Sequence, residues 1–281
     1  MKRTSIILSL FLAVMMVAGL TSCKKPVPVA DFTFTVDGLA VTFTNASTDA
    51  ATYVWSFGDD GTSTEASPVH TYADFGLYSV KLTATGEGGE DIVTKDVELV
   101  FTPAMTMDGD FTKWASIPDF VAGDGGTITK VKLNHDSKYL YVYVEGTTSL
   151  RGFFDVYMDA DNNTETGAST WIYPMGAGAD YLLEGFIADV ADADLFLDDP
   201  ATTDWSWLPA IAAGSNFVKA SALKTVTGGK AIEFSLMREM ATQLGTTINI
   251  GFVDVAEDWS MQGGLPVIGG ETSKLLQYIF D

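Results

Sequence analysis

The sequence is poor in three kinds of residue on which many functions depend. It has one cysteine and two histidines in 281 residues, and 16 lysines and arginines stand against 37 aspartates and glutamates, for a net charge of −21. A single cysteine excludes an internal disulfide framework. With two histidines, a zinc site or histidine-based catalysis is not favoured. The shortage of basic residues argues against binding to nucleic acid or docking on anionic lipid, since both need a positively charged surface.

The one cysteine lies at the end of an N-terminal hydrophobic segment. Lys2 and Arg3 precede an apolar run over residues 5–20, which is too short and wrongly flanked for a membrane-spanning helix. The run ends in Leu20-Thr21-Ser22-Cys23, which resembles the signal of bacterial lipoproteins. This resemblance implies a signal peptide over residues 1–22, lipidation of Cys23 and attachment to a membrane by acyl chains alone. The alternative is an ordinary signal peptide with an incidental cysteine.

The residues after the cysteine bear on location. Lys24 and Lys25 follow it, and no aspartate lies next to it, which favours the outer membrane over the inner membrane. The cell surface is the favoured face, although the periplasmic face stays open. Residues 23–28 are interpreted as the lipidated cysteine and a short proline-bearing linker.

Residues 29–101 are predicted to form a small β-sandwich, because short runs rich in β-branched and aromatic residues alternate with turn signals. Three stretches resemble a PKD domain: YVWSFGDDGTSTE at residues 53–65, PVHTY at 68–72 and GLYSVKLTAT at 76–85. The resemblance implies an Ig-like fold and a role as a spacer or interaction module in extracellular proteins, without enzymatic activity. Trp55 is then the buried tryptophan of the sandwich, and His70 is interpreted as a packed structural residue.

Residues 103–281 are predicted to form a second, larger β-sandwich or jelly roll, because many further strands follow one another between turn signals. One short helix is predicted over residues 237–244. Stretches at 107–114, 138–144, 154–163, 178–185 and 231–236 resemble, in this order, a DOMON-like β-sandwich of the type that includes family 9 carbohydrate-binding modules. The expected fold class is therefore all-β. The resemblance implies a polysaccharide or oligosaccharide ligand, with proteins of a glycan-uptake system as further partners.

Oxygen-bearing side chains gather after the strand predicted at residues 152–158. Asp159, Asp161 and Asn163 lie two residues apart, a spacing that can place oxygen ligands around a hard cation such as Ca²⁺. Asp180 and Glu184 are the candidates for further ligands. The alternative is a turn in which these side chains bond their own backbone.

Aromatic residues in the predicted loops are the candidates for sugar contacts, because aromatic faces pack against the apolar faces of sugars. Each of them could instead cap the core of the sandwich, which is the preferred interpretation for Trp114. The candidates are Trp171 and Tyr173 in a glycine-rich loop, Trp205 and Trp207 in a later loop, and Trp259 after Glu257 and Asp258.

The preferred hypothesis is a non-catalytic outer-membrane lipoprotein that captures glycan through these aromatic residues, with the first domain as a spacer. The alternative is an adhesion or assembly lipoprotein that binds another protein. A glycoside hydrolase is less favoured, since it needs two carboxylates at a fixed separation and no spacing singles out a pair. The carboxylates considered for such a pair are Asp155, Asp180, Glu184 and Glu233.

Overall fold

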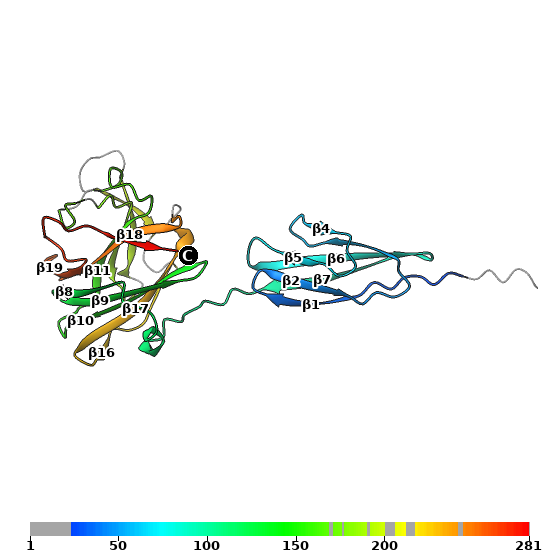
Figure 1. Ribbon diagram of the computed structural model, residues 1–281, viewed down its shortest axis with the longest axis horizontal. Helices are drawn as coiled ribbons and strands as arrows, with labels where there is room; N and C mark the ends of the chain where they lie inside the picture. Colours follow the sequence, from blue (N-terminus) through cyan, green and yellow to red (C-terminus); the bar gives the residue numbers. More distant parts are fainter. Residues whose placement is uncertain are drawn as a thin grey trace, which may run out of the picture. The chain divides into compact units, whose positions relative to one another are not determined.

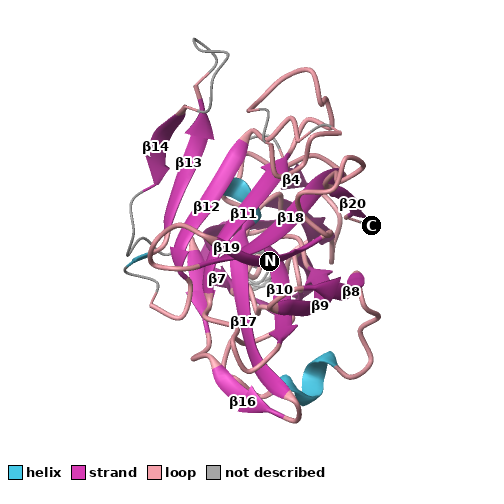
Figure 2. Ribbon diagram, turned by 90° about the vertical axis from the view of Figure 1, so that its left-hand side faces the viewer, coloured by secondary structure: helices cyan, strands magenta, loops and turns pink. Residues whose placement is uncertain are grey.

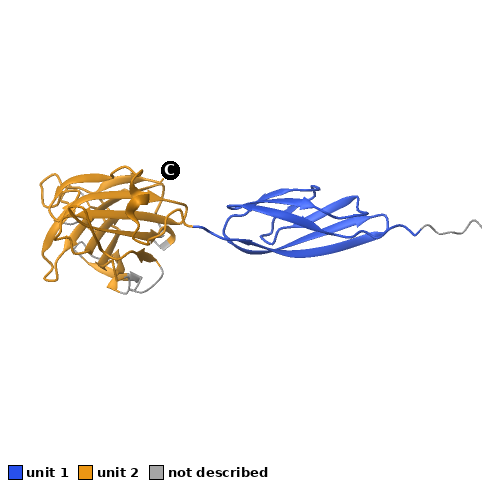
Figure 3. Ribbon diagram, turned by 90° about the horizontal axis from the view of Figure 1, so that it is seen from below, with its two compact units in different colours: residues 1–102 blue, residues 103–281 orange. Residues whose placement is uncertain are grey.

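The computed structural model describes residues 24–168, 171–175, 177–189, 192–199, 206–211, 217–240 and 244–280. Two compact units divide the chain, Met1–Thr102 and Pro103–Asp281 (Figure 3). The described residues form antiparallel strands and short 3-10 helices, so the chain is all-β as predicted. Cys23 and Trp205 lie outside the described residues. Among the described residues, no helix has the length and apolar character needed to cross a membrane.

The first unit consists of two antiparallel sheets, and Figure 1 labels all of their strands except β3. One sheet has the order β1-β2-β5, from β1 (Phe32–Asp37), β2 (Ala40–Asn45) and β5 (Val69–Thr71). The other has the order β4-β3-β6-β7, from β3 (Thr52–Ser56), β4 (Thr62–Ser63), β6 (Gly76–Gly86) and β7 (Gly89–Leu99).

Alternating side chains close the core of this first unit around Trp55. Val41 and Phe43 on β2 are buried, while the threonines between and after them face solvent. The indole Nε1 of Trp55 donates a hydrogen bond to the carbonyl oxygen of Glu65 at 2.9 Å. His70 stacks on Phe57 with ring centroids 4.1 Å apart, and its Nε2 lies 2.7 Å from Asp59 Oδ2. The histidine therefore has the packed role that the sequence predicts.

The second unit is a larger sandwich of two antiparallel sheets (Figure 2). The strands of the six-stranded sheet are β8 (Val121–Gly125), β9 (Ile128–His135), β10 (Tyr139–Gly146), β15 (Val218–Ala220), β16 (Lys224–Val226) and β17 (Gly229–Met237). Their order is β15-β17-β10-β9-β8, and β16 also pairs with β17. The strands of the seven-stranded sheet are β11 (Phe153–Asp159), β12 (Tyr181–Phe186), β13 (Asp194–Asp198), β14 (Trp207–Ile211), β18 (Thr247–Val255), β19 (Met261–Leu265) and β20 (Leu276–Ile279). Their order is β14-β13-β12-β11-β18-β19, and β20 also pairs with β18.

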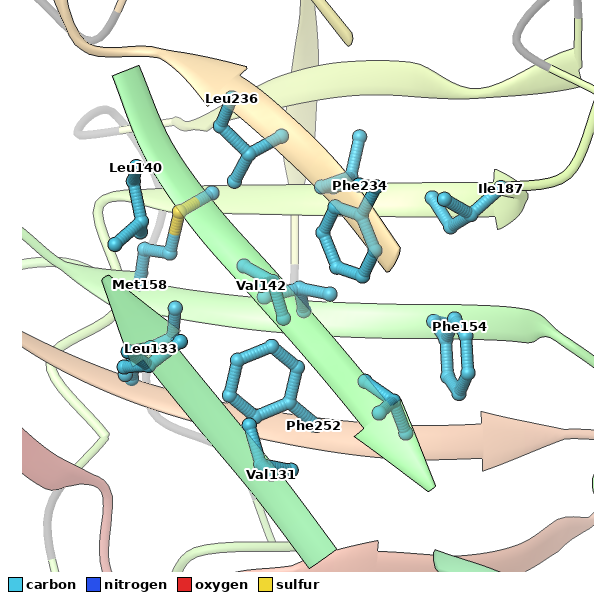
Figure 4. Close-up of a cluster of buried hydrophobic side chains, with 14 of the residues drawn as sticks. Val131, Leu133, Leu140, Val142, Phe154, Met158, Ile187, Phe234, Leu236 and Phe252 are labelled. Atoms are coloured by element: carbon cyan, nitrogen blue, oxygen red, sulfur yellow. The ribbon is translucent and has the colours of Figure 1, made fainter. Parts of the chain in front are cut away.

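The main core lies between these two sheets. Figure 4 shows side chains of β9, β10 and β17 facing those of β11 and β18. Phe154, Val156 and Met158 on β11 belong to this core, so the alternation of a strand turns Asp155 and Tyr157 to the opposite face of the seven-stranded sheet. This outer face carries a second buried cluster: Tyr157, Ile172, Tyr173, Ala177, Ala179, Leu182, Val253, Val255 and Leu275.

The short helix predicted over residues 237–244 is wrong in its described part. Met237 still belongs to β17 and pairs with Tyr139, and only Arg238–Met240 form a 3-10 helix, η3. The backbone amide of Arg238 donates to the carbonyl oxygen of Lys138 at 2.8 Å, so the pairing of β17 with the β10 side continues one residue past Met237. Residues 241–243 lie outside the described residues.

Candidate functional site

Three of the predicted cation ligands come together at one end of the seven-stranded sheet. Asp159 ends β11 and Asp180 directly precedes β12, and these two strands are paired. One carboxylate oxygen each of Asp159, Asp161 and Asp180 lies within 4.8 Å of the other two. We call these three residues the aspartate cluster.

Asp159 is the buried member of the aspartate cluster, with 0% of its surface exposed. Its Oδ2 accepts a hydrogen bond from Asn249 Nδ2 at 2.8 Å. Its Oδ1 is also buried and has no hydrogen-bond partner among the residues that the structure describes. Burial, with Asp180 and Asp161 nearby, raises the pKa of Asp159 above its ordinary value.

The backbone of the same loop is held by its own polar side chains. Asp161 Oδ1 accepts from the amide of Asn163 at 2.8 Å, and Asn163 Oδ1 accepts from the amide of Glu165 at 3.2 Å. Asp180 Oδ2 accepts from the amides of Ala160 and Asp161 at 2.8 and 3.1 Å. The side-chain oxygen of Asn163 thus serves a turn, which is the alternative that the sequence left open.

Glu184 does not belong to the aspartate cluster, and its assignment as a cation ligand is wrong. It follows Asp180 by four residues along the extended strand β12, a separation of about 13 Å at the usual rise per residue. In the β11–β12 ladder Glu184 lies opposite Asp155.

The two aromatic residues of the glycine-rich loop have opposite environments. Trp171 is 71% exposed, as a ligand-contacting residue must be, whereas Tyr173 is 0% exposed. The ring of Tyr173 packs edge-on against Tyr157 with centroids 6.0 Å apart. Its hydroxyl lies over Gly251, where a Cβ atom would come within 2.6 Å of it. The prediction that Tyr173 contacts ligand is therefore wrong, because the loop folds back and adds this ring to the outer cluster.

Trp207 is half-buried at the start of β14 and packs against the outer cluster. It lies opposite Asp198 in the β13–β14 ladder. Less of its indole is exposed to a ligand than is the case for Trp171.

Trp259 lies in the turn between β18 and β19 and is 60% exposed. Its φ of +66° is a left-handed backbone conformation that bulky residues rarely adopt. The turn is closed by hydrogen bonds from the Trp259 amide to the Ala256 carbonyl at 2.8 Å and from the Ala256 amide to the Ser260 carbonyl at 2.9 Å. The indole is edge-on to Phe153 on β11, with centroids 5.6 Å apart. The fold thus holds this exposed ring in one place.

A row of three carboxylates crosses the outer face beside this aromatic pair. Asp155 on β11 lies opposite Glu184 on β12, which lies opposite Asp194 on β13. Burial raises the pKa of Asp155 to about 6, although Tyr157 donates a hydrogen bond to its Oδ2 at 3.0 Å. Burial, and then the charges of Asp155 and Asp194, raise the pKa of Glu184 to about 7. The sequence alone does not point to Asp194, because strand register is not visible in a single sequence.

Glu233, another carboxylate considered for glycoside hydrolysis, has structural partners. Glu233 lies on the other sheet, fully buried, and accepts hydrogen bonds from Trp114 Nε1 at 2.7 Å and from the Gly109 amide at 2.6 Å. Lys113 Nζ lies 3.0 Å from its Oε1. This network confirms Trp114 as a core residue.

Comparison with known proteins identifies the first unit. The family model described as the PKD domain matches residues 24–101. These residues form a PKD domain. The pre-pro-metalloprotease PrtV of Vibrio cholerae is 41% identical over 80 residues, which are 27% of this chain and 9% of the protease. The chain thus spans about a tenth of the length of this curated relative, and the similarity is confined to the PKD domain.

Two solved structures also resemble parts of the chain. The PKD1 domain of Vibrio anguillarum Epp is 32% identical, and the match covers 28% of this chain and 99% of that domain, with a TM-score of 0.27. A carbohydrate-binding module of the β-sandwich superfamily is 16% identical, and the match covers 76% of this chain and 92% of the module, with a TM-score of 0.26.

Proposed function

We propose that this chain is a lipid-anchored outer-membrane protein whose second unit captures polysaccharide or oligosaccharide, with the PKD domain as a spacer. The observation that carries the proposal is the environment of Trp259. A bulky, mostly exposed indole is held with a positive φ against Phe153, beside a row of carboxylates. Backbone strain at an exposed aromatic residue is a reason to look for a function there.

The chemistry of this face suits a sugar. An aromatic ring packs against the apolar face of a pyranose, and a few polar groups fix its orientation. Trp259 in the turn between β18 and β19, and Trp171 in the loop between β11 and β12, supply exposed rings. Glu184, which is partly exposed, can accept hydrogen bonds from sugar hydroxyls. Because strands and a closed turn fix the Trp259–Phe153 pair before binding, less conformational entropy is lost when the ligand binds.

The capture of glycan is tested by affinity electrophoresis of a chain without residues 1–23 through gels containing different polysaccharides. We expect retardation on at least one polysaccharide, and we expect Trp259→Ala and Trp171→Ala to weaken it. Leu77→Ala is the matched control, because it removes an equally exposed apolar side chain from the PKD domain. The absence of retardation on every polysaccharide would contradict glycan capture and favour the adhesion or assembly alternative.

The lipid anchor is a separate part of the proposal. It is supported by the position of Cys23 directly after the hydrophobic segment. We expect the full chain to partition with membranes, and Cys23→Ala to remain unlipidated, as mass spectrometry of the N-terminal peptide would show. An unmodified Cys23 in the membrane-bound protein would contradict it.

A further inference from the structure

The aspartate cluster joins the two ends of the segment that carries Trp171. We propose that Asp159, Asp161 and Asp180 bind one Ca²⁺ ion, and that this ion holds the Trp171 loop in the form that captures glycan. The first half stands on the geometry of the aspartate cluster alone. The second half rests on the proposed function.

The spacing of the three carboxylates fits a shared ion. Two oxygens that each lie about 2.4 Å from one Ca²⁺ can be at most about 4.8 Å apart. One carboxylate oxygen from each of Asp159, Asp161 and Asp180 lies within that limit of the other two.

The buried oxygen of Asp159 is an independent sign of a ligand. Asp159 is fully buried, and its Oδ1 has no hydrogen-bond partner in the described part of the chain. An unpaired buried carboxylate oxygen is costly unless a proton or a cation satisfies it. No lysine or arginine is ion-paired with any member of the aspartate cluster among the described residues. A metal cation bound by the three carboxylates would pair with this oxygen and offset the repulsion among the three negative charges.

The donor atoms select the kind of metal. All three side chains offer hard oxygen ligands, which suit Ca²⁺ and Mg²⁺ rather than metals that prefer nitrogen or sulfur. Ca²⁺ accepts irregular geometry and varied coordination numbers, whereas Mg²⁺ demands near-ideal octahedral geometry. Ligands from the end of β11, from the loop after it and from the residue before β12 favour the more tolerant ion.

The same ion would fix the base of the Trp171 loop. Asp159 and Asp161 precede the loop and Asp180 follows it. Between them, the amides and carbonyls of Ala168 and Ala179 exchange two hydrogen bonds, at 2.8 and 3.1 Å. Gly178 has a φ of +49°, and a Cβ atom there would lie 2.6 Å from Thr164 Cα, so the two sides of the loop are in close contact. Without a cation, repulsion within the aspartate cluster acts to open this base.

Ion binding is tested by calorimetric titration of Ca²⁺ into the chain without residues 1–23, after treatment with chelator. We expect one ion per chain and a melting temperature that rises with Ca²⁺ concentration, because an ion that binds only the folded state stabilises it. Asp161→Asn, at an exposed position, and Asp159→Asn should each weaken binding by about tenfold or more. Asp124→Asn, an exposed substitution on β8, should leave binding unchanged. The site would be overturned by the absence of both binding heat and a shift in melting temperature at millimolar Ca²⁺. It would also be overturned if Asp159→Asn and Asp161→Asn bound Ca²⁺ as tightly as the original chain.

The coupling to glycan is tested by repeating the affinity electrophoresis with chelator and with added Ca²⁺. Retardation that is lost with chelator, restored by Ca²⁺ and not restored in Asp161→Asn supports it. Retardation that persists unchanged with chelator overturns the coupling but leaves glycan capture intact. Bound Ca²⁺ without retardation on any polysaccharide overturns glycan capture and the coupling, while the ion site stands.

Discussion

Asp155 and Glu184 face each other across the paired strands β11 and β12, on the outer side of the sheet. Asp155 is 7% exposed and its Oδ1 has no hydrogen-bond partner among the described residues. Burial raises the pKa of both carboxyls, to about 6 for Asp155 and about 7 for Glu184, and the charge of Asp155 adds to the rise for Glu184. Tyr157, Tyr173 and Asp194 are further titratable groups that couple to this pair. Like charges this close destabilise a sheet unless a proton or a ligand intervenes.

This pair predicts how stability depends on pH. From about pH 4, where carboxyls of an unfolded chain titrate, to about pH 7, the folded state holds more protons than the unfolded state. The contribution of the pair to the free energy of unfolding therefore falls as pH rises through this range and levels off above it. Glu184→Gln should gain stability relative to the original chain between pH 5 and about pH 8, measured by thermal melting. A difference in melting temperature that is constant with pH would contradict the raised pKa.

The two aromatic residues of the glycine-rich loop predict opposite effects on stability. Tyr173→Ala should lower the free energy of unfolding of the second unit by about 3 kcal/mol or more, because it empties a fully buried site in the outer cluster. Trp171→Ala should change it by about 0.5 kcal/mol or less, as is usual for exposed positions. Denaturant titration followed by circular dichroism measures both. Equal losses for the two variants would contradict the environments of these side chains.

The buried network around Glu233 predicts a structural role for this carboxylate. Glu233→Ala should cost about 3 kcal/mol, because it leaves Trp114 Nε1 and the Gly109 amide without their partner and leaves Lys113 with Asp108 alone of its two carboxylates. A variant that is stable but no longer binds glycan would contradict this role and reopen a functional assignment for Glu233.

The separate core of the PKD domain predicts that this unit adds no glycan contact. Trp55→Ala should destabilise the PKD domain by about 4 kcal/mol, because the indole is buried among aromatic rings. Retardation on polysaccharide should nevertheless persist, since the proposed contacts all lie in the second unit. Loss of retardation in this variant, with the melting transition of the second unit retained, would show that the PKD domain takes part in binding.

The residues that the sequence placed correctly are those whose roles follow from local pattern. Alternation along β2 assigns Val41 and Phe43 to the PKD core, and spacing along the chain brings Asp159 and Asp161 together. The burial of Tyr173 cannot be predicted from the sequence, because a loop that folds back on a sheet shows no periodic pattern. The surroundings of Glu184 are also hidden in the sequence. An extended strand carries it away from Asp180, and its neighbours Asp155 and Asp194 depend on register across three strands.

The central claim is that exposed aromatic rings of the second unit capture glycan, and it is tested most directly by comparing Trp259→Ala and Leu77→Ala on the polysaccharide that most retards the original chain. Both variants should melt within a few degrees of the original chain. We predict that retardation is lost for Trp259→Ala and unchanged for Leu77→Ala. Full retardation of a folded Trp259→Ala variant would contradict the account.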